Sequence, residues 1–319
     1  MKYSFYKLLY AGLVITFSPV DGAIPSAGLT ACYLFIGDAR DSGPSNINGT
    51  IHNAVLTPDR FGRPDCAYQF NGMDSFIELP DNDVFSVSTT GQMSISVWLR
   101  PDTLMFQKWE STGYVHWMGK GQSGAHEWVF RMYNLTNEEN RPNRTSFYLF
   151  NPAGGLGAGS YVQETVTNCK WMHFVAIASI TRDTITWYKN GVKMDADPIF
   201  NGDYKITPQN GTAPVRIGTR DFASYFKGAI DDLRFYNRAL TSGEVLALYN
   251  ESVETSTSLN EPEPRANIAK NRISIKTIGS TGMNVQVRIL YNRGNGSVST
   301  FDIRGRKLPP FHTKGNTNG

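Results

Sequence analysis

The alternation of apolar and polar residues predicts β-strands along most of the chain before residue 250. The stretch Gly228–Asn237 illustrates the pattern, because Ala229, Leu233 and Phe235 share one face at a period of two. Asp231 falls on that same face and Asp232 on the opposite one, so we expect the pair to straddle a sheet. A carboxylate among core positions is costly unless it is neutralised, which predicts a partner for Asp231.

The residues that follow this strand predict a short helix that closes the main domain. Thr241 is suited to the N-cap position, and Glu244, three residues later, completes a capping box. Val245, Leu248 and Tyr249 then form one apolar stripe at helical spacing. The main domain is expected to close here.

Other short runs separated by turn signals complete the pattern. Asn190-Gly191 is the clearest hairpin signal, because both central positions of such a turn favour positive φ. With almost no helix, the fold class is all-β, an antiparallel β-sandwich or barrel. The segments 101–116 and 151–159 are expected to be loops. The expected strands are Ala31–Phe35, Cys66–Phe70, Phe76–Leu79, Met93–Leu99, Trp128–Tyr133, Ser146–Phe150, His173–Ser179, Thr184–Tyr188 and Val215–Gly218.

The N-terminus predicts a secretory signal peptide over residues 1–23. Lys2 and Lys7 precede the apolar run Leu8–Phe17, and a short tail of small and polar residues follows, with cleavage expected after Gly22 or Ala23. Later apolar runs fall short of the ~18 residues of a spanning helix, so no transmembrane segment is expected. These features predict a secreted or cell-surface protein.

An exported chain meets an oxidising environment, which favours a disulfide. The cysteines are Cys32, Cys66 and Cys169. We predict a bond between Cys32 and Cys66, because both lie in strand-like runs near the start, with Cys169 left over. The spacings that zinc sites use are absent from these cysteines.

The C-terminal segment from Arg265 differs in charge from the rest of the chain. The net charge is +3, but from Arg265 onward ten Lys/Arg face one Asp, a charge of +9, so the remainder carries −6. A Ser, Thr, Glu and Pro-rich linker is expected at 251–267, between a main domain at 24–250 and a small β module at 268–319. Nucleic acid is not an expected partner, because an exported chain rarely meets it.

The order of several motifs resembles a known family. They are Tyr33-Leu34-Phe35, Asp59-Arg60-Phe61-Gly62, Ala67-Tyr68-Gln69-Phe70-Asn71-Gly72, Met93–Leu99, Trp171–Val175, Tyr188-Lys189-Asn190-Gly191 and Gly228–Tyr249. Together they resemble the laminin-G-like, concanavalin A-like jelly-roll domains of bacterial secreted proteins. The resemblance implies a two-sheet jelly roll used in lectin-like binding, adhesion or accessory modules of enzymes. The tail segment Phe301–Leu308 resembles a type IX secretion sorting domain.

Four aspartates predict a structural calcium site. Asp38 and Asp41 follow the first strand, and Asp231 and Asp232 lie in the last, which in a jelly roll is often its neighbour. Carboxylates and loop carbonyls are the hard oxygen ligands that calcium prefers, and the resembled family often carries such an ion. The alternative is that Asp231 or Asp232 caps backbone N–H groups of the loop without metal.

Aromatic residues in loops are the candidate ligand contacts. Trp109 and Tyr114 lie in the expected long loop, where flat rings suit sugar faces, although Trp109 could instead pack onto its own sandwich. Trp98, Trp171 and Trp187 lie in strand patterns and are expected in the core. The remaining candidates are Trp128, Tyr161, Asp221 and Tyr225.

Catalysis has weaker support in the sequence. Jelly-roll glycoside hydrolases need two carboxylates on one strand face, as in a Glu-x-Asp-x-x-Glu run, and the chain has no such run. His116, His126 and His173 have no Ser or Cys partner in a recognisable motif, and His173 is expected to be structural. The primary hypothesis is therefore recognition of an extracellular glycan without catalysis. The alternatives are a polysaccharide hydrolase and a structural surface protein that binds protein partners.

Overall fold

A computed structural model describes residues 23–252, except 111–112, 136–140, 142–143, 153, 165 and 204, and the backbone of strands between 273 and 308. The chain divides into two units, Met1–Asn260 and Glu261–Gly319, which are described separately. The predicted signal peptide up to residue 22, the linker from residue 253 and the segment 302–306 of the sorting resemblance lie outside the described residues. Among the described helices, none is long and apolar enough to cross a membrane.

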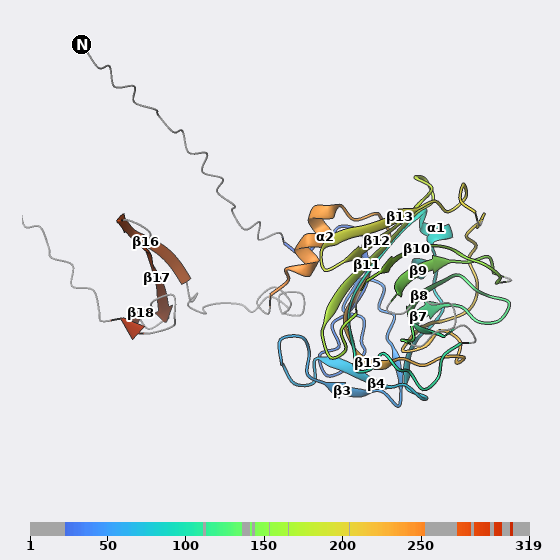
Figure 1. The fold of residues 1–319 in the computed structure, drawn as a ribbon, viewed down its shortest axis with the longest axis horizontal. Coiled ribbons are helices and arrows are strands. Elements are labelled where there is room, and N and C mark those ends of the chain that lie inside the picture. The colour runs from blue at the N-terminus through green and yellow to red at the C-terminus, as the bar shows by residue number, and fades with distance from the viewer. Residues whose placement is uncertain are drawn as a thin grey trace, which may run out of the picture. The chain divides into compact units, whose positions relative to one another are not determined.

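The first unit is a sandwich of two antiparallel sheets, which confirms the predicted fold class (Figure 1). The eight-stranded sheet consists of β1 (Leu29–Tyr33), β3 (Val55–Thr57), β4 (Ala67–Asn71), β6 (Gln92–Pro101), β11 (Met172–Ser179), β12 (Thr184–Lys189), β13 (Val192–Asp197) and β15 (Lys227–Tyr236). The seven-stranded sheet consists of β2 (Thr50–His52), β5 (Phe76–Leu79), β7 (Tyr114–Lys120), β8 (Trp128–Tyr133), β9 (Arg144–Leu149), β10 (Ala158–Gln163) and β14 (Val215–Ile217).

The interior between the sheets is rich in aromatic rings. Trp117, Trp128 and Trp187 are fully buried there. Trp187 stacks on Phe174 with ring centroids 5.0 Å apart. The short helices η1 (Asp83–Phe85) and α1 (Val87–Thr90) contribute Phe85 and Val87 to the same core. Burial of these large side chains from both inner faces is the main driving force for closing the sandwich.

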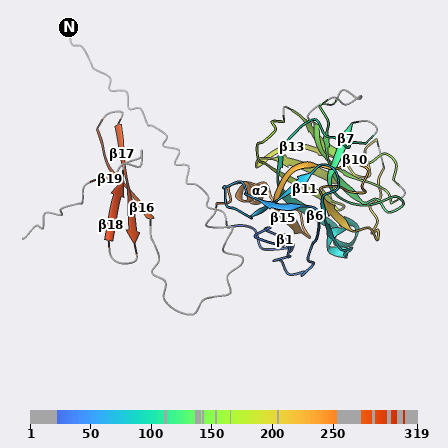
Figure 2. The ribbon, with the colours of Figure 1, turned by 90° about the horizontal axis from the view of Figure 1, so that it is seen from below.

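Strand β15 is the strand on which the eight-stranded sheet is assembled. It pairs with β6 on one side, and with β1 and β4 in turn on the other. Figure 2 shows β1, β15, β6 and β11 side by side. The expectation that the first strand lies next to the last is therefore confirmed, with Cys32 opposite Arg234.

A β-bulge in β15 overturns the predicted placement of its two aspartates. The register against β6 shifts between Asp231 and Arg234, and Asp232 has a φ of 46°. An extra residue in one strand changes which side chains face the core. Ile230 and Leu233 point into the core cluster, whereas Asp231 and Asp232 both contact Arg60 instead of straddling the sheet.

These aspartates belong to a buried ion cluster on the outer side of the sheet. Arg60 Nη1 lies 3.1 Å from Asp231 Oδ2, and the same guanidinium pairs with Asp232 and Glu251. Arg234 forms a two-pronged pair with Glu251, through Nη1 at 3.0 Å and Nη2 at 2.7 Å. Burial, and then the charge of Asp232, raise the pKa of Asp231. Two guanidinium groups thus neutralise the three carboxyl groups when Asp231 retains its proton.

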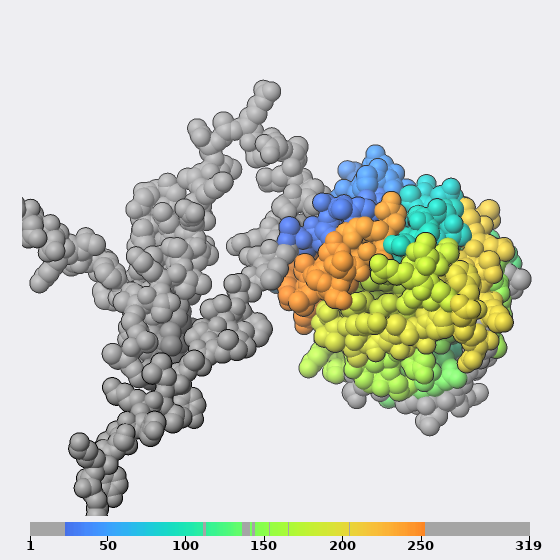
Figure 3. All heavy atoms as spheres, turned by 90° about the horizontal axis from the view of Figure 1, so that it is seen from above, coloured from blue at the N-terminus to red at the C-terminus, as the bar shows by residue number. Residues whose placement is uncertain are grey.

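The predicted helix is present as α2 (Ser242–Tyr249), and it packs on this outer face. Thr241 and Glu244 form the expected capping box. Val245 and Leu248 are buried against Val175 and Tyr188 of the sheet, in a second apolar cluster. In Figure 3 the end of this unit lies against its beginning. The predicted hairpin is also present, with Asn190 and Gly191 at positive φ between β12 and β13.

The predicted disulfide between Cys32 and Cys66 is wrong for this structure, because both are buried free thiols and Cys169 is an exposed one. The two thiols have different surroundings. Cys32 lies near Arg234 and Ser42, and Cys66 lies near Arg63 and Asp59. Burial raises the pKa of both thiols, which keeps them protonated and poorly reactive.

The second unit contains one antiparallel four-stranded sheet in the order β16-β17-β18-β19. Its strands are β16 (Ile273–Thr281), β17 (Asn284–Arg293), β18 (Ser297–Phe301) and β19 (Lys307–Leu308).

Replacing Arg60 tests the ion cluster. We expect Arg60→Met to destabilise the first unit by about 3–5 kcal/mol, because it leaves buried carboxylates without their main partner. Urea unfolding followed by tryptophan fluorescence measures the change. Arg40→Met is the matched control, because Arg40 forms an exposed pair with Asp38 and its loss should cost under about 0.5 kcal/mol. A cost below about 1 kcal/mol for Arg60→Met would contradict the role given to this cluster.

His173 predicts a specific pH dependence of stability. It is buried, its Nε2 lies 2.8 Å from Ser96 Oγ, and burial followed by the charges of Arg60 and Arg234 lowers its pKa to about 3. The unfolded chain binds this proton near pH 6.5, so the stability is complete above that pH and falls on acidification by up to about 1.4 kcal/mol per pH unit. Denaturant unfolding at pH 6.5, 5.5 and 4.5 measures the slope. A His173→Gln variant should show a shallower slope, and equal slopes would contradict the assignment.

Candidate functional site

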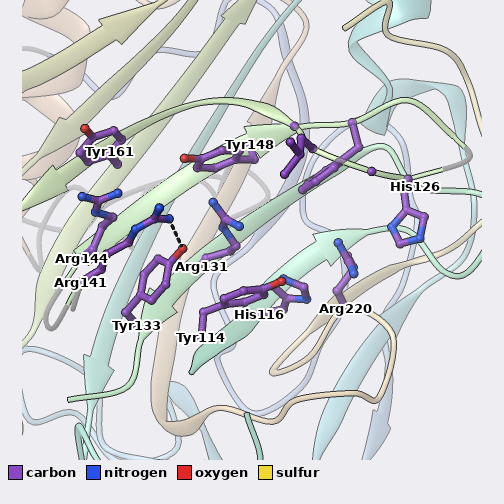
Figure 4. Close-up of a pocket in the computed structure, with 15 residues that line it drawn as sticks. Tyr114, His116, His126, Arg131, Tyr133, Arg141, Arg144, Tyr148, Tyr161 and Arg220 are labelled. Atoms are coloured by element: carbon purple, nitrogen blue, oxygen red, sulfur yellow. Dashed lines mark hydrogen bonds between the residues drawn. The ribbon is translucent and has the colours of Figure 1, made fainter. Parts of the chain in front are cut away.

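A groove of about 600 Å³ crosses the outer face of the seven-stranded sheet (Figure 4). Its lining combines aromatic rings with cationic side chains, whereas carboxylates are absent from the described lining residues. The lining residues are Tyr114, His116, His126, Arg131, Tyr133, Arg141, Arg144, Tyr148, Phe150, Gly154, Gly155, Leu156, Gly157, Tyr161 and Arg220.

Strand alternation explains why these side chains gather. In β8, Trp128, Phe130 and Met132 enter the core, so Arg131 and Tyr133 point outward. In β9, Phe147 and Leu149 enter the core, and Arg144 and Tyr148 point outward in the same way. Neighbouring strands thus place alternate rings and cations on one surface. Tyr114 of β7 and Tyr161 of β10 extend this surface to both sides.

Two glycines let the rings lie flat across the sheet. Gly159 in β10 is opposite Tyr148, and a Cβ at Gly159 would overlap the Tyr148 ring. A Cβ at Gly157 would come within 2.8 Å of the Phe150 ring. Side chains at either position would displace the rings that form the groove floor.

The arginines stack on these tyrosines. The Arg131 guanidinium lies 3.7 Å from the centroid of the Tyr148 ring, and that of Arg144 lies 3.9 Å from the Tyr161 ring. Arg141 Nη1 donates a hydrogen bond to Tyr133 Oη at 3.1 Å, the dashed line in Figure 4. Stacking fixes the planes of the guanidinium groups and leaves their edges available as hydrogen-bond donors.

An ionic network borders one end of the groove. His116 Nδ1 lies 2.8 Å from Glu110 Oε1 and 4.0 Å from Asp221 Oδ1. Arg220 pairs with Asp221 and lies 3.9 Å from Glu110. Burial alone would raise the pKa of both carboxyl groups. The hydrogen bond and charge of His116 lower the pKa of Glu110 below its usual range, and His116 together with Arg220 lowers the pKa of Asp221 in the same way. Both carboxylates are therefore ionised at neutral pH.

This charge state bears on the hydrolase alternative. A glycosidase of the two-carboxylate type needs one protonated carboxyl to act as the acid, usually with a raised pKa. The lowered pKa values of Glu110 and Asp221 work against that role. The network holds negative charge and positions His116 and Arg220 at the groove wall.

The same network contains a candidate metal site. One potential ligand atom from each of Glu110, His116 and Asp221 lies within 4.8 Å of the other two. Calcium prefers six to eight oxygen ligands. Here one donor is an imidazole nitrogen, and Arg220 already pairs with Asp221. The donor set does not fit calcium.

The four aspartates predicted as calcium ligands have other partners. Asp41 accepts hydrogen bonds from the backbone N–H groups of Cys32, Gly43 and Ile47 at 2.7–3.0 Å, so it fixes the loop after the first strand. Asp38 pairs with Arg40 at the surface. Asp231 and Asp232 pair with Arg60. The guanidinium group occupies the position next to the last strand that the predicted ion was expected to fill.

Three of the predicted ligand residues lie at or beside the groove. Tyr114 and Tyr161 line it, and Asp221 belongs to its bordering network. Trp128 is a correction, because it is fully buried and its Nε1 donates to Phe85 O at 2.8 Å. Tyr225 is also buried, and its ring centroid lies 5.0 Å from Lys108 Nζ.

Trp109 is 47% exposed and is not among the groove residues. Sequence analysis missed Arg131, Arg144 and Tyr148, which lie within or beside predicted strands. The signal that could have identified them is the presence of Arg and Tyr, instead of small polar residues, at the outward positions of these strands.

Comparisons with solved structures agree with the fold. Domain 4 of an extracellular arabinanase from Geobacillus stearothermophilus, in complex with arabinotriose, is 24% identical with a TM-score of 0.52, covering 70% of this chain and 99% of that one. The receptor-binding domain of a botulinum neurotoxin C/D mosaic serotype is 10% identical, with a TM-score of 0.52, covering 86% and 73%. The binding domain of botulinum neurotoxin DC in complex with rat synaptotagmin II gives the same values. At these identities the likeness shows the fold.

Sequence comparison places the chain in a family. No curated protein matches it. The laminin-G-like profile described as the concanavalin A-like lectin/glucanases superfamily matches residues 71–246, more than half of the 319 residues. The chain belongs to the concanavalin A-like lectin/glucanases superfamily.

Proposed function

We propose that the first unit is a secreted or cell-surface carbohydrate-binding domain that holds a glycan in the outer groove and acts in recognition or adhesion without catalysis. The observation that carries this proposal is the groove floor, in which Tyr148 and Tyr161 lie under guanidinium groups. The rings hold the guanidinium groups in place, and the fixed N–H donors of these groups can bind sugar oxygens.

One solved structure of this fold is a complex with a sugar, arabinotriose, and another is a complex with a protein, synaptotagmin II. The chemistry of the groove favours the sugar. Its lining is hollowed and contains many donors, whereas a protein-binding face is expected to offer a broader surface with an apolar centre. Protein binding at the surface stays the alternative.

An extracellular role fits the expected organisation of the chain. The predicted signal peptide at 1–23 supports export. The linker at 251–267 and the β module at 268–319, with its resemblance to a type IX sorting domain, support a tail used in secretion or attachment.

Removing either groove ring should weaken glycan binding. We expect Tyr148→Ala and Tyr161→Ala each to weaken binding at least about tenfold, roughly 1.4 kcal/mol, because each removes the ring that holds an arginine in orientation. Glycan-array screening followed by calorimetry with the best ligand measures the effect.

Trp109→Ala is the matched control, since it removes an exposed ring outside the groove and should leave affinity unchanged. Loss of binding in Trp109→Ala with retention in the tyrosine variants would move the site to the loop and contradict the proposal.

Calcium should have little effect on this unit. A weak extracellular-type site, with a dissociation constant of about 10⁻⁴–10⁻³ M, would raise the melting temperature by several degrees at 10 mM calcium. We expect the melting temperature to differ by under about 1 °C between EDTA and calcium. The reason is that Arg60 pairs with Asp231 and Asp232, and that Asp41 already accepts hydrogen bonds from backbone N–H groups. Differential scanning calorimetry measures it, and a rise of several degrees would restore the calcium hypothesis.

A further inference from the structure

The two ends of the groove differ in whether carboxylates neutralise their arginines. At the first, Arg220 lies beside Asp221 and Glu110. At the other, Arg131 and Arg144 have no carboxylate partner among the described residues. The difference is informative, because the same protein pairs other buried arginines with carboxylates, Arg234 with Glu251 and Arg216 with Glu78.

Arg131 is the strongest observation. It is only 8% exposed and projects from the centre of β8 into the groove, as Figure 4 shows. Its Nε is buried without a hydrogen-bond partner. Its guanidinium lies 3.7 Å from the ring centroid of Tyr148 and 5.1 Å from that of Tyr114. Burying a guanidinium without an opposite charge is costly, and ring faces offset only part of that cost.

Arg144 adds a second cation beside it. Arg131 pairs across the strands with Ser146, so Arg144 lies two residues along β9, at the diagonal position. Diagonal positions place Cβ atoms roughly 7–8 Å apart, within reach of long side chains. Arg144 Nε donates to Gln163 Oε1 at 3.0 Å, which holds the group without neutralising it. Two oriented cations therefore face one short segment of any bound chain.

The nearby titratable groups do not supply the missing charge. Burial raises the pKa of Tyr148, so its hydroxyl stays neutral. Burial, and then the charge of Arg220, lower the pKa of His126, which keeps this imidazole neutral as well. The described lining residues thus carry positive charge, and none of them is a carboxylate.

We propose that the groove is built for an acidic glycan, with the carboxylate or sulfate groups of the sugar chain pairing with Arg131 and Arg144. This inference rests on the proposed function and specifies its substrate class. Guanidinium groups bind carboxylate and sulfate oxygens through paired N–H donors. The tyrosines hold these two guanidinium groups in orientation.

The test compares three soluble polymers against the full chain: polygalacturonate, dextran sulfate and neutral dextran. Affinity electrophoresis and calorimetry at two salt concentrations measure binding. We expect at least one acidic polymer to bind at least tenfold more tightly than dextran, with affinity falling as salt rises. Comparing the two acidic polymers identifies whether carboxylate or sulfate is preferred.

Charge-removing variants localise the effect. Arg131→Gln and Arg144→Gln should each weaken binding of the acidic polymer about tenfold or more, and Arg40→Gln, an exposed arginine outside the groove, should not. These variants are needed because the basic tail from Arg265 onward would attract any polyanion. Arg131→Gln should keep or raise the melting temperature, because it removes a buried charge without a partner.

The outcomes separate this inference from the proposed function. Equal binding of acidic and neutral polymers, lost in Tyr148→Ala but kept in Arg131→Gln, would overturn the acidic-glycan inference and leave glycan binding intact. Acidic binding that is unchanged by Arg131→Gln and Arg144→Gln would assign the attraction to the tail and overturn the inference too. Absence of binding to any glycan would overturn both.

Discussion

The buried pairing of Arg60 with Asp231 and Asp232 is the interaction on which the first unit depends. It forms where a bulge in β15 turns two consecutive carboxylates toward one guanidinium. Arg234 and Glu251 extend it to the end of the unit. Since Arg60 lies between β3 and β4, and its partners lie in β15 and after α2, the cluster can form only when these segments meet. The aromatic core supplies most of the driving force for that closure.

Arg131 differs from the other buried arginines of the sandwich. On the eight-stranded sheet, Arg234 is matched by Glu251, and on the seven-stranded sheet Arg216 is matched by Glu78. Arg131 instead lies in the groove against the Tyr148 ring, without a carboxylate partner among the described residues. Because the sandwich pairs its other buried arginines, the exception at Arg131 is the feature that the acidic-glycan inference explains.

Much of the architecture could be predicted from the sequence, because strand alternation and turn chemistry are local. The capping box at Thr241, the Asn190-Gly191 turn and the pairing of first and last strands are all present. The placement of Asp231 and Asp232 could not be predicted, because a bulge depends on the register of a partner strand. Arg60 was equally invisible as their partner, since it is about 170 residues away.

The groove was harder to predict for a related reason. Its edges are formed by β7 and β10, which begin inside segments expected to be loops. The glycines of β10 read as flexibility in the sequence, but Gly159 lies flat under the Tyr148 ring and makes room for it. Aromatic residues in loops, such as Trp109, therefore give a stronger sequence signal for ligand contact than strand residues such as Arg131. In this sandwich the outward positions of central strands line the groove, and an arginine there has to be explained by what it pairs with.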